Sequence, residues 1–484
     1  MPLPALMSRL FPHILVLIAL IPFLTAPEAA GQQTLDTILD QADPERIQRD
    51  VMELASGRYR GRATGTEEMI EASLYVREQL VGAGLHPAIG DSSYFQRFRV
   101  DYNQIKSPAR LSTVVGGDTT HLEPLRDFMP DQHSGSGRFP WSDLLILDST
   151  DAQSGYVHAA GKVALYLPPT LHDAPEDLDA FDRRGLPARH QLSVARALHS
   201  VGARAMLVPG LIYGRIGMES VEGFPIFIVT RDEAERLVAE RGQRTVRIAG
   251  KVRAELHRDR ETVNVVGRWP GSDQELADQH VLLTAHTDHV GTIAGGVHYG
   301  AHDNATGTAV LIEVARLVRA AADRGMTPRR SILFVGFSGE EMGLAGSRYY
   351  VEADPVVPLN ETMAVLNLDI VGGGTGFMMV GALNFPTYYE LVAELNEARF
   401  GHEIRKRDNA PNSDHYFFGA RGIPAAFLYA LDGPPIAIHT PNDTADKMDP
   451  AFMADAARLA FAVVWRLANL NPDEAGELRV QAAP

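Results

Sequence analysis

The chain lacks cysteine altogether, although its 484 residues are enough for two or three domains. Without thiols there can be no disulfide framework, no thiolate metal site and no lipid-modified cysteine. Any metal site must therefore use histidine and carboxylate ligands. The absence is compatible with export from the cell, provided that the core or bound metal ions stabilise the fold.

Positive charge is also in short supply. Lys and Arg together number 45, against 61 Asp and Glu, which gives a formal net charge of -16. A surface that binds phosphates needs the opposite sign, so we expect no nucleic-acid partner. The acidic balance favours solubility and, mildly, cationic ligands such as free α-amines.

Long apolar runs are scarce. The segment ILVLIALIPFLT at residues 14–25 is too short to cross a bilayer comfortably. Arg9 precedes it, and the small residues Ala29 and Gly31 follow, which is the pattern of a secretory signal peptide. We predict that residues 1–31 are a signal peptide and that the mature protein is periplasmic or extracellular, without a stable membrane anchor. An uncleaved anchor is the alternative.

Two sequence patterns divide the remainder of the chain. From about residue 261, short apolar strands such as HVLLTAH and SILFVGF alternate with amphipathic helices. This predicts an α/β domain with a mixed, mostly parallel central sheet flanked by helices. Residues 107–253 have shorter β-prone segments and few clustered ligands, which predicts a separate β-rich module. The predicted divisions are an N-terminal helical part (32–106), the inserted module (107–253), the catalytic domain (254–470) and a flexible tail (471–484).

Imidazoles and carboxylates stand where the predicted strands of the catalytic domain end, and in the turns beside them. Ligands of open α/β sheets bind beyond the carboxyl ends of the strands, so these side chains are candidates for one site. They are His286 and Asp288 after VLLTA, Asp303 before the long helix, Glu340 and Glu341 after SILFVGFS, Asp369 after MAVLNL, and His439 in a Pro-rich turn.

Each of these residues alone has a plainer explanation. An acidic residue before a helix is most often a cap, and adjacent glutamates most often form a solvated face. Capping does not explain why independent strand ends all finish in imidazole or carboxylate. The set suits a divalent ion such as zinc and exceeds what one four-coordinate ion needs. We therefore predict two ions that share a carboxylate, with His286 as a ligand and Asp288 orienting its other ring nitrogen.

Six motifs resemble peptidase family M28, a family of di-zinc peptidases. The helices at 43–88 also resemble the N-terminal part of that family, and residues 107–253 resemble the protease-associated (PA) module that many members carry. Between about residues 261 and 450 the motifs occur in the family's order: AHTDHVG, GAHDNATGTA, FSGEEMGLAGS, NLDIVG, SDHYFF with GIPAAFL, and HTPNDT.

The resemblance implies a division of roles among the candidate ligands. One zinc ion would be held by His286, Asp303 and Asp369. The other would be held by Asp303, Glu341 and His439, so that Asp303 bridges the two. Other divalent ions are possible in place of zinc.

The resemblance also implies that Glu340 is the general base. It would accept a proton from the attacking water and pass it to the leaving amine, a role typically worth roughly 10²–10⁴ in rate. Ser413 and Asp414 are possible supporting residues around the metal ligands.

The group that stabilises the oxyanion is unknown. Family members often carry a tyrosine for this purpose at places where this chain has Ile438 and Ala410. Tyr416 and Tyr429 are possible substitutes, although a structural role explains each of them as well.

Peptides with a free N-terminus are the expected substrates, because an acid-rich site can hold an ammonium group. A carboxypeptidase of the same family is the alternative; it needs a cationic clamp, which RKRD at 405–408 could supply. A glutaminyl cyclase-like enzyme or a non-catalytic, receptor-like member would lack part of the ligand set or the base. Serine hydrolysis does not fit, because GFSGE at 336–340 misses the final glycine of the nucleophile elbow. Deletion of 107–253 is expected to alter substrate range or solubility more than the metal site.

Overall fold

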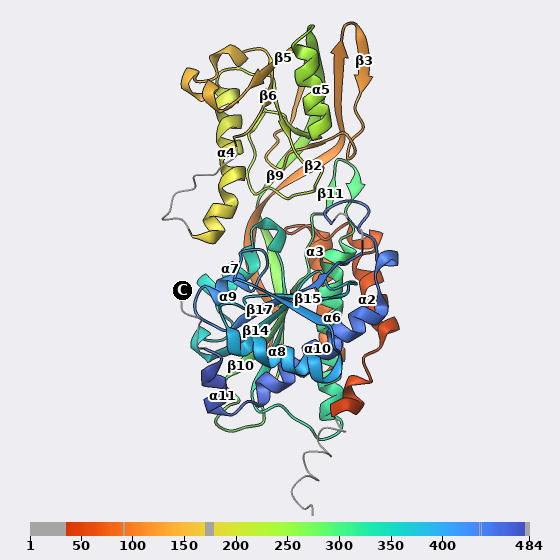
Figure 1. The fold of residues 1–484 in the computed structure, drawn as a ribbon, viewed down its shortest axis with the longest axis vertical. Helices are drawn as coiled ribbons and strands as arrows, with labels where there is room; N and C mark the ends of the chain where they lie inside the picture. The colour runs from red at the N-terminus through yellow and green to blue at the C-terminus, as the bar shows by residue number, and fades with distance from the viewer. Residues whose placement is uncertain (1–34, 91, 170–178, 435, 437, 480–484) are drawn as a thin grey trace, which may run out of the picture.

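The computed structural model describes residues 35–90, 92–169, 179–434, 436 and 438–479. The signal peptide predicted at 1–31 lies outside the described residues. Among the residues that are described, no helix is long and apolar enough to cross a membrane. Figure 1 shows a lower lobe that contains the N-terminal helices and the C-terminal half of the chain, and an upper lobe formed by the middle of the chain.

A mixed, mostly parallel sheet with helices on its faces forms the lower lobe, which confirms the predicted fold class. Neighbouring strands β13, β10, β14 and β17 run parallel to one another. The strands β9 and β15 flank them in antiparallel orientation. In spatial order the strands are β16 (Glu403–Arg407), β15 (Gly376–Val380), β17 (Ala425–Leu431), β14 (Thr362–Leu368), β10 (His280–His286), β13 (Ser331–Phe337) and β9 (Val246–Trp269).

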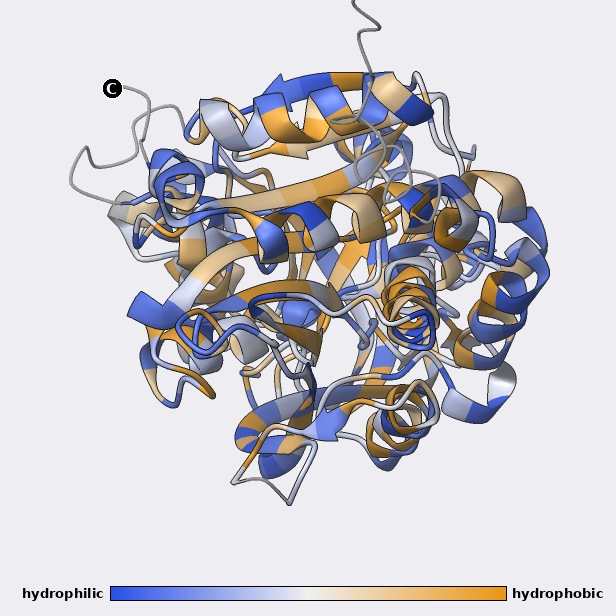
Figure 2. Cartoon of the chain, turned by 90° about the horizontal axis from the view of Figure 1, so that it is seen from below, coloured by the Kyte–Doolittle hydropathy of each residue, from blue (hydrophilic) through white to orange (hydrophobic). Residues whose placement is uncertain are grey.

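Helices cover both faces of this sheet, which is why its strands are apolar throughout. Alternate strand residues point to opposite faces. In β10, Val281 and Leu283 pack in the core beneath α6 and α10, whereas Leu282 packs with Tyr350 and Phe418 of α7 and α9. Figure 2 shows the central strands largely orange between helices that carry both colours. The helices are α2 (Pro44–Leu54), α3 (Glu67–Gly82), α6 (Thr306–Ala322), α7 (Ala345–Glu352), α8 (Pro386–Arg399), α9 (Tyr416–Gly419) and α10 (Pro450–Asn469).

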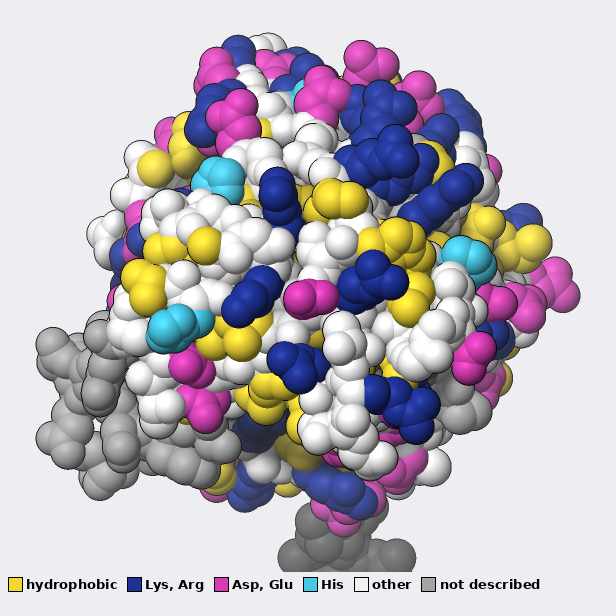
Figure 3. All heavy atoms as spheres, turned by 90° about the horizontal axis from the view of Figure 1, so that it is seen from above, with side chains coloured by type: hydrophobic (Ala, Val, Ile, Leu, Met, Phe, Trp, Pro, Cys, Tyr) yellow, Lys and Arg dark blue, Asp and Glu magenta, His cyan; other side chains and the backbone are white. Residues whose placement is uncertain are grey.

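The upper lobe is built from the segment that we propose as the inserted module. Its strands β5, β6, β7 and β8 are parallel, and β4 closes the edge in antiparallel orientation. Seen from this end, charged side chains of both signs are mixed over the surface (Figure 3). The elements are β4 (Phe128–Pro130), β5 (Gly137–Leu147), β6 (Val163–Tyr166), α4 (Ala180–Ser200), β7 (Ala205–Pro209), β8 (Ile226–Val229) and α5 (Arg231–Arg241).

Two long antiparallel strands run from one lobe into the other (Figure 1). The strand β2 (Phe95–Val115) pairs with β9 from Phe95↔Val265 to Val115↔Val246. The proposed divisions at 106/107 and 253/254 therefore fall inside continuous strands, and the lobes are joined by a hydrogen-bonded ladder rather than by loops. Short strands complete the fold: β1 (His86–Pro87), β3 (Asp118–His121), β11 (Thr292–Ile293) and β12 (Gly296–Val297).

The flexible tail predicted at 471–484 is wrong for its first part. Residues Pro472–Glu477 form α11, which begins with a capping box between Asn471 and Glu474. Leu478 is buried, and Arg479 donates a hydrogen bond to the Thr362 carbonyl at 2.9 Å. Local capping and one apolar anchor therefore hold a segment whose composition is polar. Residues 480–484 lie outside the described residues.

Arg62 joins three parts of the lower lobe that are distant in sequence. Its side chain is fully buried and donates hydrogen bonds to the carbonyls of Leu54, Thr287, Tyr299 and Gly300 at 2.6–2.8 Å. Burial lowers the pKa of Arg62 to about 10, so the guanidinium stays charged at neutral pH. It thus ties the end of α2 to the turn after β10 and to the segment before α6.

Replacement of Arg62 by Met is expected to lower the free energy of unfolding by about 3 kcal/mol or more, because buried carbonyls would lose their donor. Urea denaturation monitored by circular dichroism measures the change. Arg58→Met is the control, because the Arg58 side chain is 62% exposed. Equal effects of the two substitutions would contradict the structural role of Arg62.

Candidate metal centre

The parallel strands bring the predicted ligands to one edge of the sheet. His286 is the last residue of β10 and lies opposite Phe337, the last residue of β13. Asp369 directly follows β14, which pairs with β10 on its other side. After β13 the chain turns through Gly339, with φ of 79°, into the short 3-10 helix Glu340–Met342. Strand ends that share an edge thus place an imidazole and carboxylates around one space.

One group of possible ligands is His286, Asp303 and Asp369. The His286 Nε2 atom lies 3.2 Å from Asp303 Oδ1 and 3.3 Å from Asp369 Oδ1. One ligand atom from each residue lies within 4.8 Å of the others, and all three residues are buried. This is the set that the family resemblance assigns to one ion.

A second group lies on the other side of Asp303. The His439 Nε2 atom is 2.9 Å from Asp303 Oδ2 and 3.1 Å from Glu341 Oε2. His289 joins the group, with Nδ1 2.8 Å from Glu341 Oε1. The two carboxylate oxygens of Asp303 therefore face different groups, which is the geometry that a bridging ligand requires.

Asp303 does not cap the following helix, which was the plainer explanation of its position. It lies in the segment Ala301–Ala305, and the residue before α6 is Ala305, which makes no side-chain cap. The backbone amides of His302 and Asp303 donate to the two carboxylate oxygens of Asp443 at 2.7 and 3.1 Å. Asn304 donates to the Leu368 carbonyl at 2.9 Å. These contacts fix Asp303 against the end of β14.

Asp288 connects the turn after β10 with the turn that carries the glutamates. Its Oδ1 atom lies 3.5 Å from His286 Nδ1. It accepts hydrogen bonds from the Thr64 hydroxyl at 2.7 Å and from the backbone amides of Glu340 and Glu341 at 3.2 and 3.4 Å. The Asp288 backbone carbonyl lies closer to His286 Nδ1, at 3.2 Å. Asp288 thus lies beside the ring nitrogen of His286 that faces away from Asp303 and Asp369.

Ser413, one of the two possible supporting residues, contacts a carboxylate of the first ligand group. Asp414, the other, is a buried carboxyl group with a raised pKa. The Ser413 hydroxyl donates to Asp369 Oδ2 at 2.8 Å and accepts from Asn367, which in turn accepts from Thr284 at 2.6 Å. This chain of hydrogen bonds orients Asp369. Asp414 is fully buried, and burial raises its pKa to about 7.

Glu340 stands beside the two groups but belongs to neither. Burial raises the pKa of its carboxyl well above the usual value; the neighbouring Glu341 and Asp369 act in the same direction, while His286 opposes them. Because the side chain of Glu341 is engaged with two histidines, the adjacent glutamates diverge. Glu340 is therefore placed beside the two groups without being a member of either.

The charge distribution suits cations at both groups. Burial would lower the pKa of His286, yet Asp369, Asp288 and Asp303 outweigh it and raise that pKa well above the usual value. Burial is likewise outweighed at His439, chiefly by Glu341, and the pKa of this histidine also rises. Protons on the imidazoles thus balance the buried carboxylates. Divalent ions can replace those protons, because metal ligands must be deprotonated.

The side chains of the two groups are of the types that bind zinc. They provide imidazole nitrogens and carboxylate oxygens, which zinc accepts in tetrahedral sites. The His289 Nε2 atom is also buried without a hydrogen-bond partner among the described residues, which is unusual for a polar group. The residues present therefore fit two divalent ions.

His289 and a loop of the upper lobe are the parts of the centre that sequence reasoning missed. His289 belongs to the motif AHTDHVG, so this motif could have indicated a second histidine near the site, but the sequence analysis assigned no role to it. Tyr213 and Gly214, which lie between β7 and β8, contact His439 directly. No local pattern indicates that this loop reaches the site, because the contact joins residues more than two hundred positions apart.

The two tyrosines considered as oxyanion donors are packing residues. Tyr416 stacks on Phe181 of α4, with ring centroids 6.2 Å apart. Tyr429 packs against Phe427, with centroids 5.2 Å apart. The oxyanion donor remains unassigned.

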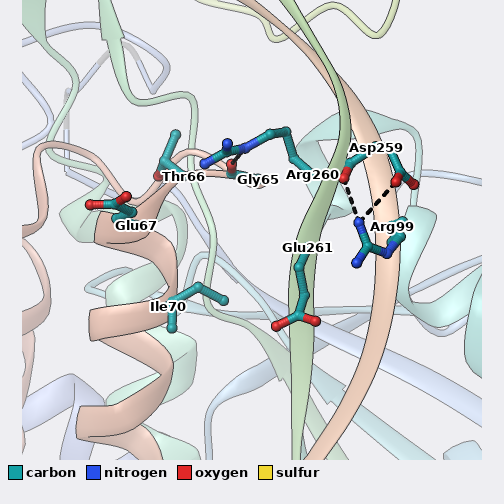
Figure 4. A pocket seen from close by; sticks show the side chains of 8 residues that line it. All are labelled: Gly65, Thr66, Glu67, Ile70, Arg99, Asp259, Arg260 and Glu261. Carbon is teal, nitrogen blue, oxygen red and sulfur yellow. Dashed lines mark hydrogen bonds and ion pairs between the residues drawn. The ribbon is translucent and has the colours of Figure 1, made fainter.

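A surface pocket of about 300 Å³ lies apart from the centre (Figure 4). Arg99 pairs there with Asp259, and Arg260 donates to the Gly65 carbonyl at 3.2 Å. None of its lining residues belongs to either ligand group. The pocket and the two ligand groups are therefore separate features of the structure.

One family model and several known proteins are similar to parts of this chain. Residues 264–464 match the model of peptidase family M28. A probable glutamate carboxypeptidase from Zea mays is 30% identical over 220 residues, which cover 41% of this chain and 29% of that protein. A probable leucine aminopeptidase from Arthroderma otae is 30% identical over 223 residues, which cover 42% of this chain and 57% of that protein. The chain thus spans less than two thirds of these relatives.

A zinc aminopeptidase from Bacillus subtilis is among the similar solved structures. The superposition gives a TM-score of 0.60 at 18% identity and covers 89% of this chain and 96% of that chain. At this identity the likeness shows a shared fold, and it extends over both lobes.

Replacement of His289 by Ala is expected to weaken metal binding by roughly 10–100-fold, because Glu341 would lose the contact that orients it. Competition with a coloured chelator measures the dissociation constants. His289→Asn retains a donor at the position of Nδ1 and is expected to recover part of the affinity. An alanine variant with the affinity of the unmodified protein would show that His289 has no part in the centre.

Proposed function

Residues 264–464 are a peptidase family M28 domain, and from this premise we propose that the chain is an exported di-zinc aminopeptidase. The single observation that carries the proposal is the position of Asp303, whose two carboxylate oxygens face two separate ligand groups. In the proposed centre, His286, Asp303 and Asp369 hold one ion, and Asp303, Glu341 and His439 hold the other. Asp288, Ser413 and Asp443 support this arrangement through the contacts described above.

The chain's own residues divide the chemistry between positioning and proton transfer. When bound, the two ions would polarise the scissile carbonyl and lower the pKa of water from 15.7 towards about 7. Glu340 accepts the proton of the attacking water and delivers it to the leaving amine. Burial and the neighbouring carboxylates raise the pKa of Glu340, which makes it a stronger proton acceptor than an ordinary glutamate.

Free N-termini are the proposed point of attack. The carboxylates around the two groups attract an ammonium group. The basic segment at 405–408, considered as a binding site for a terminal carboxylate, lies away from these groups. Those residues are exposed, and β16 is separated from β14 by β15 and β17. Arg405 is engaged with Glu403 at 2.8 Å.

Carboxypeptidase activity stays the alternative for one specific reason. Arg215 stands beside the centre, with its guanidinium carbon 5.5 Å from the centroid of the Tyr213 ring. A cation at this place could hold a terminal carboxylate. One of the two relatives described above is named a carboxypeptidase and the other an aminopeptidase, so substrates must decide.

Replacement of Glu340 by Ala should leave both ions in place and reduce turnover by roughly 10²–10⁴, the usual contribution of a positioned base. Elemental analysis and initial rates on the same preparation measure the two quantities. The matched control is Asp303→Ala, which should lose metal and melt at a lower temperature, because ions stabilise only the folded form. Loss of metal from the Glu340 variant would reassign that residue as a ligand.

A panel of free and N-blocked aminoacyl anilides and peptides tests the substrate class. Aminopeptidase activity predicts hydrolysis of the free compounds and at least a hundredfold slower hydrolysis of the blocked ones. Elemental analysis of the same protein tests for two divalent ions. Turnover of blocked peptides alone would favour the carboxypeptidase alternative.

A further inference from the structure

The loop of residues 212–217, between β7 and β8, extends from the upper lobe to the second ligand group. The Gly214 amide donates to the His439 carbonyl at 2.9 Å, and the Gly214 carbonyl lies 2.7 Å from His439 Nδ1. The Tyr213 ring stacks on the His439 ring with centroids 4.1 Å apart and planes inclined by 17°. Three contacts therefore hold one histidine of the proposed centre.

His439 depends on such contacts more than the other histidine ligand does. His286 ends a central strand, and the sheet fixes its backbone. His439 lies in an irregular turn with φ of 59°, beyond the last strand of the sheet. Because Nδ1 donates to the Gly214 carbonyl, Nε2 is the ring nitrogen that faces Asp303 and Glu341 and that a bound ion would use as a ligand.

The loop is itself held firmly in place. The Asn103 amide of β2 donates to the Gly217 carbonyl at 2.8 Å, which anchors the loop in the long strands that join the lobes. A Cβ atom at Gly214 would lie 3.0 Å from atoms of both Val290 and His298, so this residue packs tightly against the lower lobe. The loop therefore links the position of the His439 side chain to the position of the upper lobe.

We propose that residues 212–217 are a positioning part of the second ligand group, so that the ion held by His439 depends on the inserted module while the ion held by His286 does not. This rests on the proposed di-metal function. It differs from the expectation that deletion of 107–253 alters substrate range or solubility more than the metal site, because the loop contacts His439.

Stepwise removal of metal tests the proposal. Protein loaded with zinc is dialysed against increasing concentrations of a chelator, and the zinc retained per chain is measured. The unmodified protein should lose its two ions at high chelator concentrations. Tyr213→Ala should lose one ion at a roughly 10–100-fold lower concentration and keep the other, as expected when a support of a ligand is removed.

Matched variants separate positioning from general damage. Tyr213→Phe keeps the stacked ring and should behave like the unmodified protein, and so should Leu211→Ala, because Leu211 is 74% exposed beside the loop. Gly214→Ala should reproduce the loss of one ion by displacing the carbonyl from Nδ1. Melting temperatures confirm that each variant is folded, and Tyr213→Leu replaces the alanine variant if that one unfolds.

Two results would overturn the proposal: release of both ions together in the folded Tyr213 and Gly214 variants, or release at the concentrations of the unmodified protein. Two ions bound in every variant with unchanged release would leave the proposed function intact while removing the role of the loop. Unmodified protein that binds no divalent ion would refute both.

Discussion

Buried carboxylates that repel one another meet at one edge of the sheet, and the contacts around them are arranged to hold them there. Asp303, Glu341 and Asp369 lie within hydrogen-bond distance of the same few imidazole nitrogens, away from solvent. Like charges in a medium of low dielectric constant repel strongly unless positive charge lies between them. The structure supplies that charge in part through raised pKa values of His286 and His439. Divalent ions would supply more of it in the same space, which is why the arrangement favours a metal centre over a set of ion pairs.

The surrounding fold holds these charges where they would not gather by themselves. Parallel strands bring His286 and Asp369 to one edge, and Asp443 fixes the segment of Asp303 through two backbone amides. Arg62 binds the carbonyls of the adjacent turns and adds a buried cation behind the site. Fully hydrogen-bonded supports of this kind restrict the ligands to one geometry, which a centre with a shared carboxylate requires.

Sequence reasoning reached the parts of the site that follow from strand periodicity. Because the ends of parallel strands meet at one edge of a sheet, the sequence alone predicted a shared site for His286, Asp303, Glu341 and Asp369. His439 stood among the same candidates, but its assignment to an ion needed the family resemblance, since a histidine in a turn carries no periodic signal. The contact of Tyr213 and Gly214 with His439 could not be predicted, because it depends on how the upper lobe docks. The predicted domain boundaries were likewise limited by long-range pairing. A change of composition at 107 and 253 did not indicate that β2 continues through the first boundary and β9 through the second.

The two ligand groups differ in which parts of the chain fix their side chains. The first is made by residues between His286 and Asp369, all within one half of the central sheet and its turns. The second takes His439 from an irregular turn, and this turn is steadied by the upper lobe through Gly214 and Tyr213. In the proposed centre, the upper lobe would thus affect the second ligand group without contributing a ligand, because its backbone carbonyl at Gly214 orients a histidine that the lower lobe provides.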